Sequence, residues 1–249
     1  MRKLLLAAAA TLALSQTAQA AFTVTYEAPG VVNSTAAFDF KGVENFSGRS
    51  SGTFNTDFGT TGQDTLITGT YSNVQVLGAD QYGGASNDNY AAATAANAYS
   101  LSLSAQSNGT AVAVTYFGYW LSALDGGNRL EISRNGTTVF SFNPSDVLAS
   151  LGTCPNLYCG NPVSGANQGR NAGEPYAFVN FFDQSGLGFD TVRFFESPAV
   201  GNYESDNHTV GFYRTITGTP VNVPEPASLA LFGMGLLGMG LARRRQIKG

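Results

Sequence analysis

Ten segments of the chain alternate apolar and polar residues with a period of two, which is the spacing of a β-strand. They span 22–27, 36–40, 65–77, 99–105, 111–123, 129–134, 137–142, 176–182, 189–196 and 209–217. β-branched and aromatic residues are common in them, whereas no comparable amphipathic helix is found. The pattern predicts an all-β domain. Many strands joined by Gly, Asn and Asp turns favour a two-sheet antiparallel β-sandwich of the jelly-roll kind.

Local turn signals refine this prediction. Asn135-Gly136 lies between two alternating segments and supplies the positive φ angles of a type I′ turn, so residues 130–142 are expected to form a hairpin. Residues 145–151 and, more weakly, 91–98 favour short helical excursions. Residues 47–62 and 78–97 are rich in small polar residues and are expected to form long loops.

The N-terminal 20 residues have the composition of a signal peptide. Arg2 and Lys3 precede an apolar region, and Ala18-Gln19-Ala20 is an A-x-A cleavage site. The alternative is a transmembrane anchor, but the apolar region is too short to span a bilayer. The mature chain is therefore expected to begin at Ala21, with an exported domain over residues 21–222.

The C-terminal residues 223–249 form a second addressing segment. It begins with Val223, Pro224, Glu225 and Pro226, continues through the uncharged apolar residues 227–242, and reaches Arg243, Arg244 and Arg245. As a helix the apolar run covers about 24 Å, slightly less than a bilayer core of about 30 Å. It predicts a marginal transmembrane helix over 227–242. The three arginines would stop transfer and keep the C-terminus in the cytoplasm.

This order of features resembles the PEP-CTERM sorting signal of Gram-negative surface proteins. The resemblance implies one partner, an exosortase at the inner membrane, which releases or transfers the protein during export. It further implies a transient inner-membrane anchor, followed by the cell surface or secretion. The same tail occurs on some proteins catalogued as carrying an ice-binding protein C-terminal domain. The alternative is an ordinary membrane anchor, in which Pro224-Glu225-Pro226 would be coincidental.

Part of the exported domain also resembles exosortase-dependent surface proteins. The resemblance rests on residues 114–132, on Cys159-Gly160-Asn161-Pro162, and on residues 176–181 with Asn180. It supports the β fold and the location of the protein rather than an activity.

The charge of the exported domain narrows its partners. Residues 21–222 contain seven basic and 16 acidic residues, a formal net charge of −9. This excludes nucleic acid and anionic lipid as favoured partners, because neither would be attracted. Charged residues make up 12% of the chain, against about 25% in typical domains. Gly, Ser, Thr and Asn take the polar positions, as in many extracellular β proteins.

Cys154 and Cys159 are the two ends of the six-residue sequence Cys-Pro-Asn-Leu-Tyr-Cys, which lies in a loop segment rich in Pro and Asn. In an exported protein such a pair predicts a disulfide that staples a loop. A metal site is the rival interpretation, although two thiols without a nearby histidine are too few for zinc.

No catalytic residue is predicted. A serine or cysteine nucleophile needs a base, and the one histidine, His208, stands at the start of an expected strand as a loop-edge residue. Glycoside hydrolysis needs two carboxylates across a groove. The available carboxylates show no pair in an apolar setting that would raise one pKa; they are Glu131, Asp183, Asp190, Glu196 and Glu204.

No cofactor is predicted, but calcium is the ion that the acidic and amide clusters would bind. Asp125 with Asn128, and Asp206 with Asn207, are the leading clusters. Asp and Asn also favour tight turns, which is the alternative for both.

Aromatic residues could stack on sugar rings. Trp120 lies among apolar neighbours and is expected in the core, whereas Tyr158 and Tyr203 are surface candidates in loops. Ice binding would need a flat, regular array of threonines, and the threonines are scattered along the sequence.

The sequence therefore predicts an exported cell-surface or biofilm-matrix protein that is not an enzyme, a binding or structural module associated with extracellular polysaccharide. One alternative is a carbohydrate-active enzyme with a two-carboxylate groove. Another is a purely structural coat component, which would self-associate without affinity for glycans.

Overall fold

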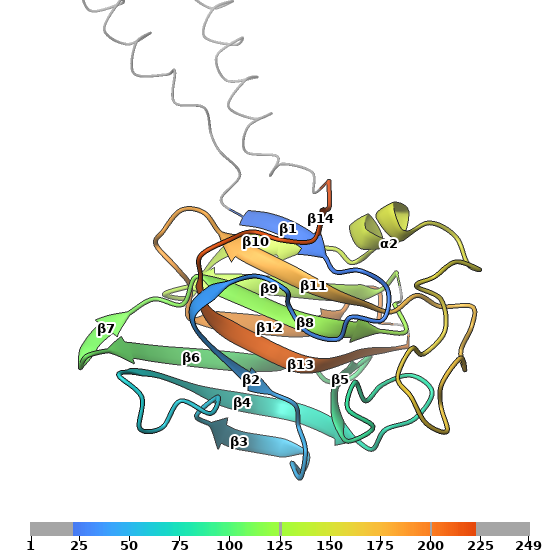
Figure 1. Ribbon diagram of the computed structural model, residues 1–249. Helices are drawn as coiled ribbons and strands as arrows, with labels where there is room; N and C mark the ends of the chain where they lie inside the picture. Colours follow the sequence, from blue (N-terminus) through green and yellow to red (C-terminus); the bar gives the residue numbers. More distant parts are fainter. Residues whose placement is uncertain (1–21, 125, 200, 223–249) are drawn as a thin grey trace, which may run out of the picture.

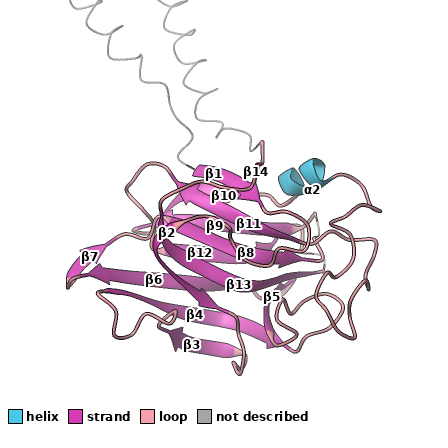
Figure 2. Ribbon diagram, viewed as in Figure 1, coloured by secondary structure: helices cyan, strands magenta, loops and turns pink. Residues whose placement is uncertain are grey.

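The computed structural model describes residues 22–124, 126–199 and 201–222 (Figure 1). This part of the chain is built almost entirely from antiparallel strands (Figure 2), so the all-β prediction is confirmed. The strands are β1 (Phe22–Tyr26), β2 (Phe38–Glu44), β3 (Gly52–Thr56), β4 (Thr65–Leu77), β5 (Tyr90–Thr94), β6 (Tyr99–Ser107), β7 (Thr110–Val112), β8 (Tyr116–Ser122), β9 (Asn128–Arg134), β10 (Thr137–Phe142), β11 (Ala177–Asp183), β12 (Thr191–Glu196), β13 (Asn202–Tyr213) and β14 (Thr219–Pro220).

The strands form one curled sheet that bends along β4. Residues 65–72 of β4 pair with β6, and residues 75–77 pair with β5. We call β10-β9-β12-β6-β4, with β3 and β7 at its margin, the first leaf. The second leaf is β4-β5-β13-β8-β11-β1-β14, with β2 beside β13. Because hydrogen bonds run through β4 from one leaf to the other, the arrangement as two separate sheets stays a prediction.

The core lies between the two leaves and is rich in aromatic side chains. Tyr99 of β6 stacks on Phe194 of β12, with ring centroids 4.6 Å apart, and Phe117 of β8 meets Phe194 edge-on at 6.0 Å. All three side chains are at least 98% buried. Burial of such large apolar surfaces is the main stabilising term in a fold of this size.

Several local predictions can be compared with the structure. The hairpin of β9 and β10 turns at Asn135 and Gly136, with φ angles of 50° and 74°, as predicted. The helix α2 (Ser145–Leu151) is also confirmed. The helix expected over 91–98 is wrong, because Ala91–Ala93 belong to β5 and are fully buried between β4 and β13. The two expected long loops likewise contain strands β3 and β5.

Among the described residues, no helix is long and apolar enough to cross a membrane. The predicted signal peptide (1–20) and transmembrane helix (227–242) lie outside those residues.

Candidate functional site

The chain leaves the domain from β14, directly before the predicted sorting motif. β14 pairs with β1, and beyond it the backbone N–H of Val221 donates to the carbonyl of Val24 at 2.9 Å. Val221 is buried. One residue, Asn222, separates this buried position from Val223, where the predicted sorting segment begins. β1 and β14 lie side by side, so both ends of the domain are at one edge (Figure 1). The motif residues 223–226, the arginines 243–245, and Ala18 and Ala20 lie outside the described residues.

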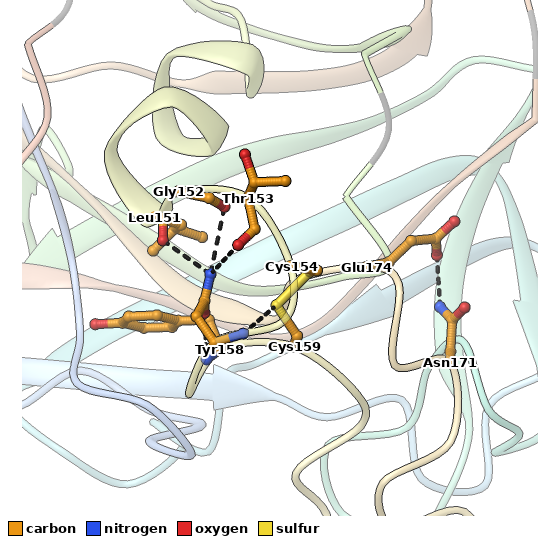
Figure 3. Close-up of a disulfide and its surroundings, with 9 residues drawn as sticks. Leu151, Gly152, Thr153, Cys154, Tyr158, Cys159, Asn171 and Glu174 are labelled. Atoms are coloured by element: carbon orange, nitrogen blue, oxygen red, sulfur yellow. Dashed lines mark hydrogen bonds between the residues drawn. A yellow bond between two sulfur atoms is a disulfide. The ribbon is translucent and has the colours of Figure 1, made fainter.

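The disulfide between Cys154 and Cys159 is present as predicted. Inside its ring the side-chain Nδ2 of Asn156 donates to the carbonyls of Leu151, Gly152 and Thr153, at 3.1, 3.3 and 3.2 Å (Figure 3). The ring therefore holds the end of α2 to the following loop. This is the stapling role that the sequence predicts.

The loop that follows the disulfide is anchored by Asn161, which is 98% buried. Its Nδ2 donates to the carbonyl of Asp80 at 3.3 Å, and its Oδ1 accepts the N–H of Val163 at 2.9 Å. Gly160, directly before it, has a φ of 83°, which favours glycine. The Cys-Gly-Asn-Pro sequence thus has a structural use in joining two loops.

His208 lies in the centre of the core, so its prediction as a loop-edge residue is wrong. Between Asp206 and Thr209 the β13 strand advances by three residues, while the paired β8 strand advances by two. The extra residue is a β-bulge, and it turns the His208 side chain back to the core. Its Nδ1 lies 3.0 Å from the Tyr71 hydroxyl and its Nε2 lies 3.1 Å from the Ser205 hydroxyl. Burial lowers the pKa of His208 to about 3, so the imidazole is neutral.

Asp206 and Asn207 use their side chains to hold this bulge. The Asp206 carboxylate accepts the N–H of Asn207 and the N–H of Ala85, each at 2.7 Å. The Asn207 Nδ2 donates to the carbonyl of Val32 at 2.9 Å. Burial raises the pKa of Asp206 to about 7, which weakens it as a cation ligand. These contacts give both side chains a structural role, but in a bulge within β13 rather than in the tight turn that the sequence alternative expected.

Asn128, the other amide proposed for calcium, is fully buried at the start of β9. Neither its Oδ1 nor its Nδ2 has a hydrogen-bond partner among the described residues. It faces Glu196 of β12 across the strand pair. Asp125 lies outside the described residues, so the pairing of Asp125 with Asn128 stays a prediction.

The aromatic surface predictions are partly wrong. Trp120 is buried as expected and packs on Tyr176, with ring centroids 5.6 Å apart. Tyr203 is fully buried, because its hydroxyl bonds to the Tyr119 hydroxyl inside the core. Tyr158 is half-buried, and its hydroxyl donates to the carbonyl of Glu27 at 3.2 Å. Tyr203 therefore offers no platform to a sugar ring.

The described carboxylates are mostly engaged in structure. Asp183 accepts the N–H groups of Ser185 and Gly188 at 2.8 and 2.7 Å, and Glu131 pairs with Arg193 at 3.3 Å. Three hollows lined by described residues contain one carboxylate each, from Asp57, Asp190 or Glu174. Paired acids across a groove, which glycoside hydrolysis needs, are not formed in these three.

A row of polar side chains crosses the outer face of the first leaf. Cross-strand pairing joins β3, β4, β6, β12, β9 and β10 through directly opposed residues. We call this the hydroxyl row; its members are Asn55, Thr70, Ser102, Thr191, Ser133 and Thr138. Along β6 the residues on either side of Ser102 are apolar, and in β12 Val192, next to Thr191, is buried in the core, so the row faces solvent.

The next row along the same face carries charge. It contains Ser72, Ser100, Arg193, Glu131 and Ser141. The hydroxyl row brings three threonines that are distant in the sequence onto one face, Thr70, Thr191 and Thr138, together with serines and an asparagine. Sequence reasoning missed the hydroxyl row because its six members come from six strands, and their register is set by tertiary structure.

A polar hollow of about 640 Å³ lies at the β3 end of the hydroxyl row, and we call it the β3 hollow. Arg49 is fixed on its rim, because its Nε and Nη2 donate to the Glu44 carboxylate at 3.1 and 2.6 Å. The guanidinium also lies over the Phe54 ring, 4.8 Å from the centroid. The hollow is lined by Arg49, Asn55, Thr56, Asp57, Thr68, Gly69 and Thr70.

Comparison with known proteins gives one match. No curated protein sequence and no solved structure matches the chain. A family model described as the PEP-CTERM protein-sorting motif matches residues 222–246, which include the Pro-Glu-Pro sequence, the apolar run and the three arginines. The chain therefore carries a PEP-CTERM protein-sorting motif, attached through Asn222 to the last strand of an antiparallel β domain.

Proposed function

We propose that the protein is exported, sorted through its C-terminal motif by an exosortase, and displayed at the cell surface or in the extracellular matrix as a non-catalytic module that associates with polysaccharide. Export through sorting machinery of the exosortase type is supported by the match at residues 222–246. The signal peptide and the arginines 243–245 agree with passage through the inner membrane of a Gram-negative cell.

The single observation that carries the association with polysaccharide is the hydroxyl row. Hydroxyl and amide groups both donate and accept hydrogen bonds, as do the hydroxyl groups of a sugar chain. The row crosses six strands at about 4.8 Å per strand, so it offers an extended ligand contacts over roughly 24 Å. A chain that lies across the strands could contact each member in turn.

A carbohydrate-active enzyme is the weaker candidate, because the β3 hollow contains a single carboxylate, that of Asp57. A structural coat component would need no glycan contact. These functions are separated by one experiment. Protein purified after expression of the full chain is incubated with the host's own extracellular polysaccharide, with calcium or with chelator, and both retention and release of sugar are measured.

Saturable retention without release of sugar supports the proposal. Release of reducing sugar would favour the enzyme. Self-association without retention would favour the structural coat component, and loss of retention with chelator would show that binding requires a divalent cation.

A further inference from the structure

The β3 hollow has the chemistry of a site for a polyhydroxylated ligand. Thr70 donates its hydroxyl to the Asn55 Oδ1 at 2.8 Å, and the amide Nδ2 of the exposed Asn55 is a donor group. Asp57 supplies a carboxylate that accepts the N–H of Gly59 at 2.8 Å and retains further acceptor capacity. The lining therefore contains both hydrogen-bond donors and acceptors. Binding sites for apolar small molecules are instead lined mainly by apolar side chains.

The charges in the hollow favour a ligand without charge. The Arg49 guanidinium is balanced by Glu44 through two hydrogen bonds. The carboxylate of Asp57 is fully exposed, and the hydrogen bonds from Thr61 and Gly59 hold its pKa below the usual range, so it is ionised at neutral pH. An acidic sugar would meet this charge, and the exported domain as a whole carries −9.

The place of the hollow in the fold also favours a ligand outside the cell. β3 lies at the opposite end of the molecule from β1 and β14, where the chain continues to its sorting motif (Figure 1). The β3 hollow is therefore at the opposite end of the domain from the strand that leads to the sorting motif.

We propose that the β3 hollow binds one sugar unit of an uncharged polysaccharide, with the rest of the chain lying along the hydroxyl row. Asn55 and Thr70 belong to both the hollow and the row, so they join the two. Arg49 and Asp57 form the rim that fixes the sugar unit. This inference rests on the proposed association with polysaccharide and assigns it to particular residues.

The test uses protein purified after expression of the full chain, and the host's extracellular polysaccharide separated by anion exchange into uncharged and anionic fractions. Affinity electrophoresis in gels containing either fraction measures the dissociation constant. The hollow variant is Asn55→Ala with Thr70→Val, which removes two polar groups from neighbouring strands. The matched control is Ser72→Ala with Ser100→Ala, an opposed pair on β4 and β6 that lies on the same face but outside both the hollow and the hydroxyl row. Thermal melting confirms that both variants are folded.

We expect the hollow variant to bind the uncharged fraction at least about tenfold more weakly, since two hydrogen bonds are lost. The control variant should lose about threefold or less. Equal losses in both variants, or full affinity in the hollow variant, would overturn the assignment to the hollow and leave the proposed function standing. Stronger binding to the anionic fraction would overturn the ligand class. If the unmodified protein binds neither fraction, the proposed function itself fails.

Discussion

Phe22 of β1 stacks on Phe140 of β10, with ring centroids 4.8 Å apart. β10 is one end of the strand order, and β1 lies next to the other end. The contact therefore closes the curled sheet through side chains, on the side opposite the bend in β4. Phe140 also meets Phe181 edge-on at 6.1 Å, which ties it to β11.

Phe140→Ala should lower the free energy of unfolding by about 3 kcal/mol, because it leaves a cavity where the two ends meet. Phe140 is preferable to Phe22 as the test position, since Phe22 is next to the expected signal cleavage site. Urea unfolding followed by Tyr and Trp fluorescence measures the loss. Phe195→Ala, on the outer face under Arg193, is the control and should cost about 1 kcal/mol or less. Equal losses would show that Phe140 does not close the sheet.

His208 and Asp206 should give opposite pH dependences of stability. The folded pKa of His208, about 3, lies below its ordinary value of 6.5, so its contribution is complete above pH 6.5 and is lost as pH falls. The folded pKa of Asp206, about 7, lies above its ordinary value of 3.8, so its contribution is complete below pH 3.8 and is lost as pH rises. Between about pH 4 and 6.5 the two effects oppose each other.

Replacing either residue should expose the effect of the other. Relative to the unmodified protein, His208→Phe should lose stability as pH rises from 4 to 6.5, and Asp206→Asn should lose stability as pH falls over the same range. Each slope should approach about 1.4 kcal/mol per pH unit. Urea unfolding at pH 4.5, 5.5 and 6.5 gives the slopes. Parallel pH profiles for all three proteins would contradict the assignment of these pKa shifts.

Alanines in place of Pro224, Glu225 and Pro226 should leave the unprocessed chain in the inner membrane of the host. The reason is that the matched sorting motif includes this sequence. Cell fractionation and the mass of the released protein measure the effect. Pro220→Ala, in β14 and outside the matched residues, should still be processed. Normal release of the triple variant would refute the role of the motif.

Gly218→Ala should detach β14 from β1. Gly218 has a φ of 85°, and a Cβ there would lie 2.7 Å from the Thr25 Oγ1 and 2.8 Å from the carbonyl oxygen of Tyr26. Hydrogen exchange at the N–H of Val221, which bonds to Val24, should become at least about tenfold faster. Gly109→Ala is the matched control, because its φ is 74° and no atom lies within 4 Å of the added Cβ. Unchanged exchange at Val221 in the Gly218 variant would show that β14 tolerates the side chain.

Replacement of Cys154 and Cys159 by serine should cost about 2 kcal/mol, as expected for a loop this short. Hydrogen exchange should rise mainly in residues 152–161, where Asn156 holds the end of α2. A uniform rise across all the strands would mean that the disulfide supports the whole fold rather than one loop.

The sequence predicted those elements whose conformation depends on neighbouring residues alone, such as a tight turn and a short helix. Asn135-Gly136 specifies its turn whatever surrounds it, and the segment 145–151 follows Pro144, which suits a helix start. The alanines 91–93 favour a helix by propensity, yet they form β5, because small side chains fit where β4 and β13 approach. Tertiary packing overrides propensity there.

The candidate site depended on information that a linear pattern does not carry. His208 is followed by alternating residues and looks like the start of a strand, but the bulge at Asp206 and Asn207 extends β13 through it. Asn55 and Thr138 are 83 positions apart, and only the pairing of six strands aligns them. The sorting motif was predictable because its chemistry lies within one continuous segment.

The strand β4 belongs to both leaves, and this limits how related chains can change in length. Residues 65–72 set the register with β6, while residues 75–77 set it with β5. A shift of one residue in a strand exchanges its two faces. An insertion or deletion within β4 would therefore turn Ile67 and Tyr71, both fully buried, towards solvent and misalign the opposite leaf. The length of β4 is therefore constrained by two registers at once, one for each leaf.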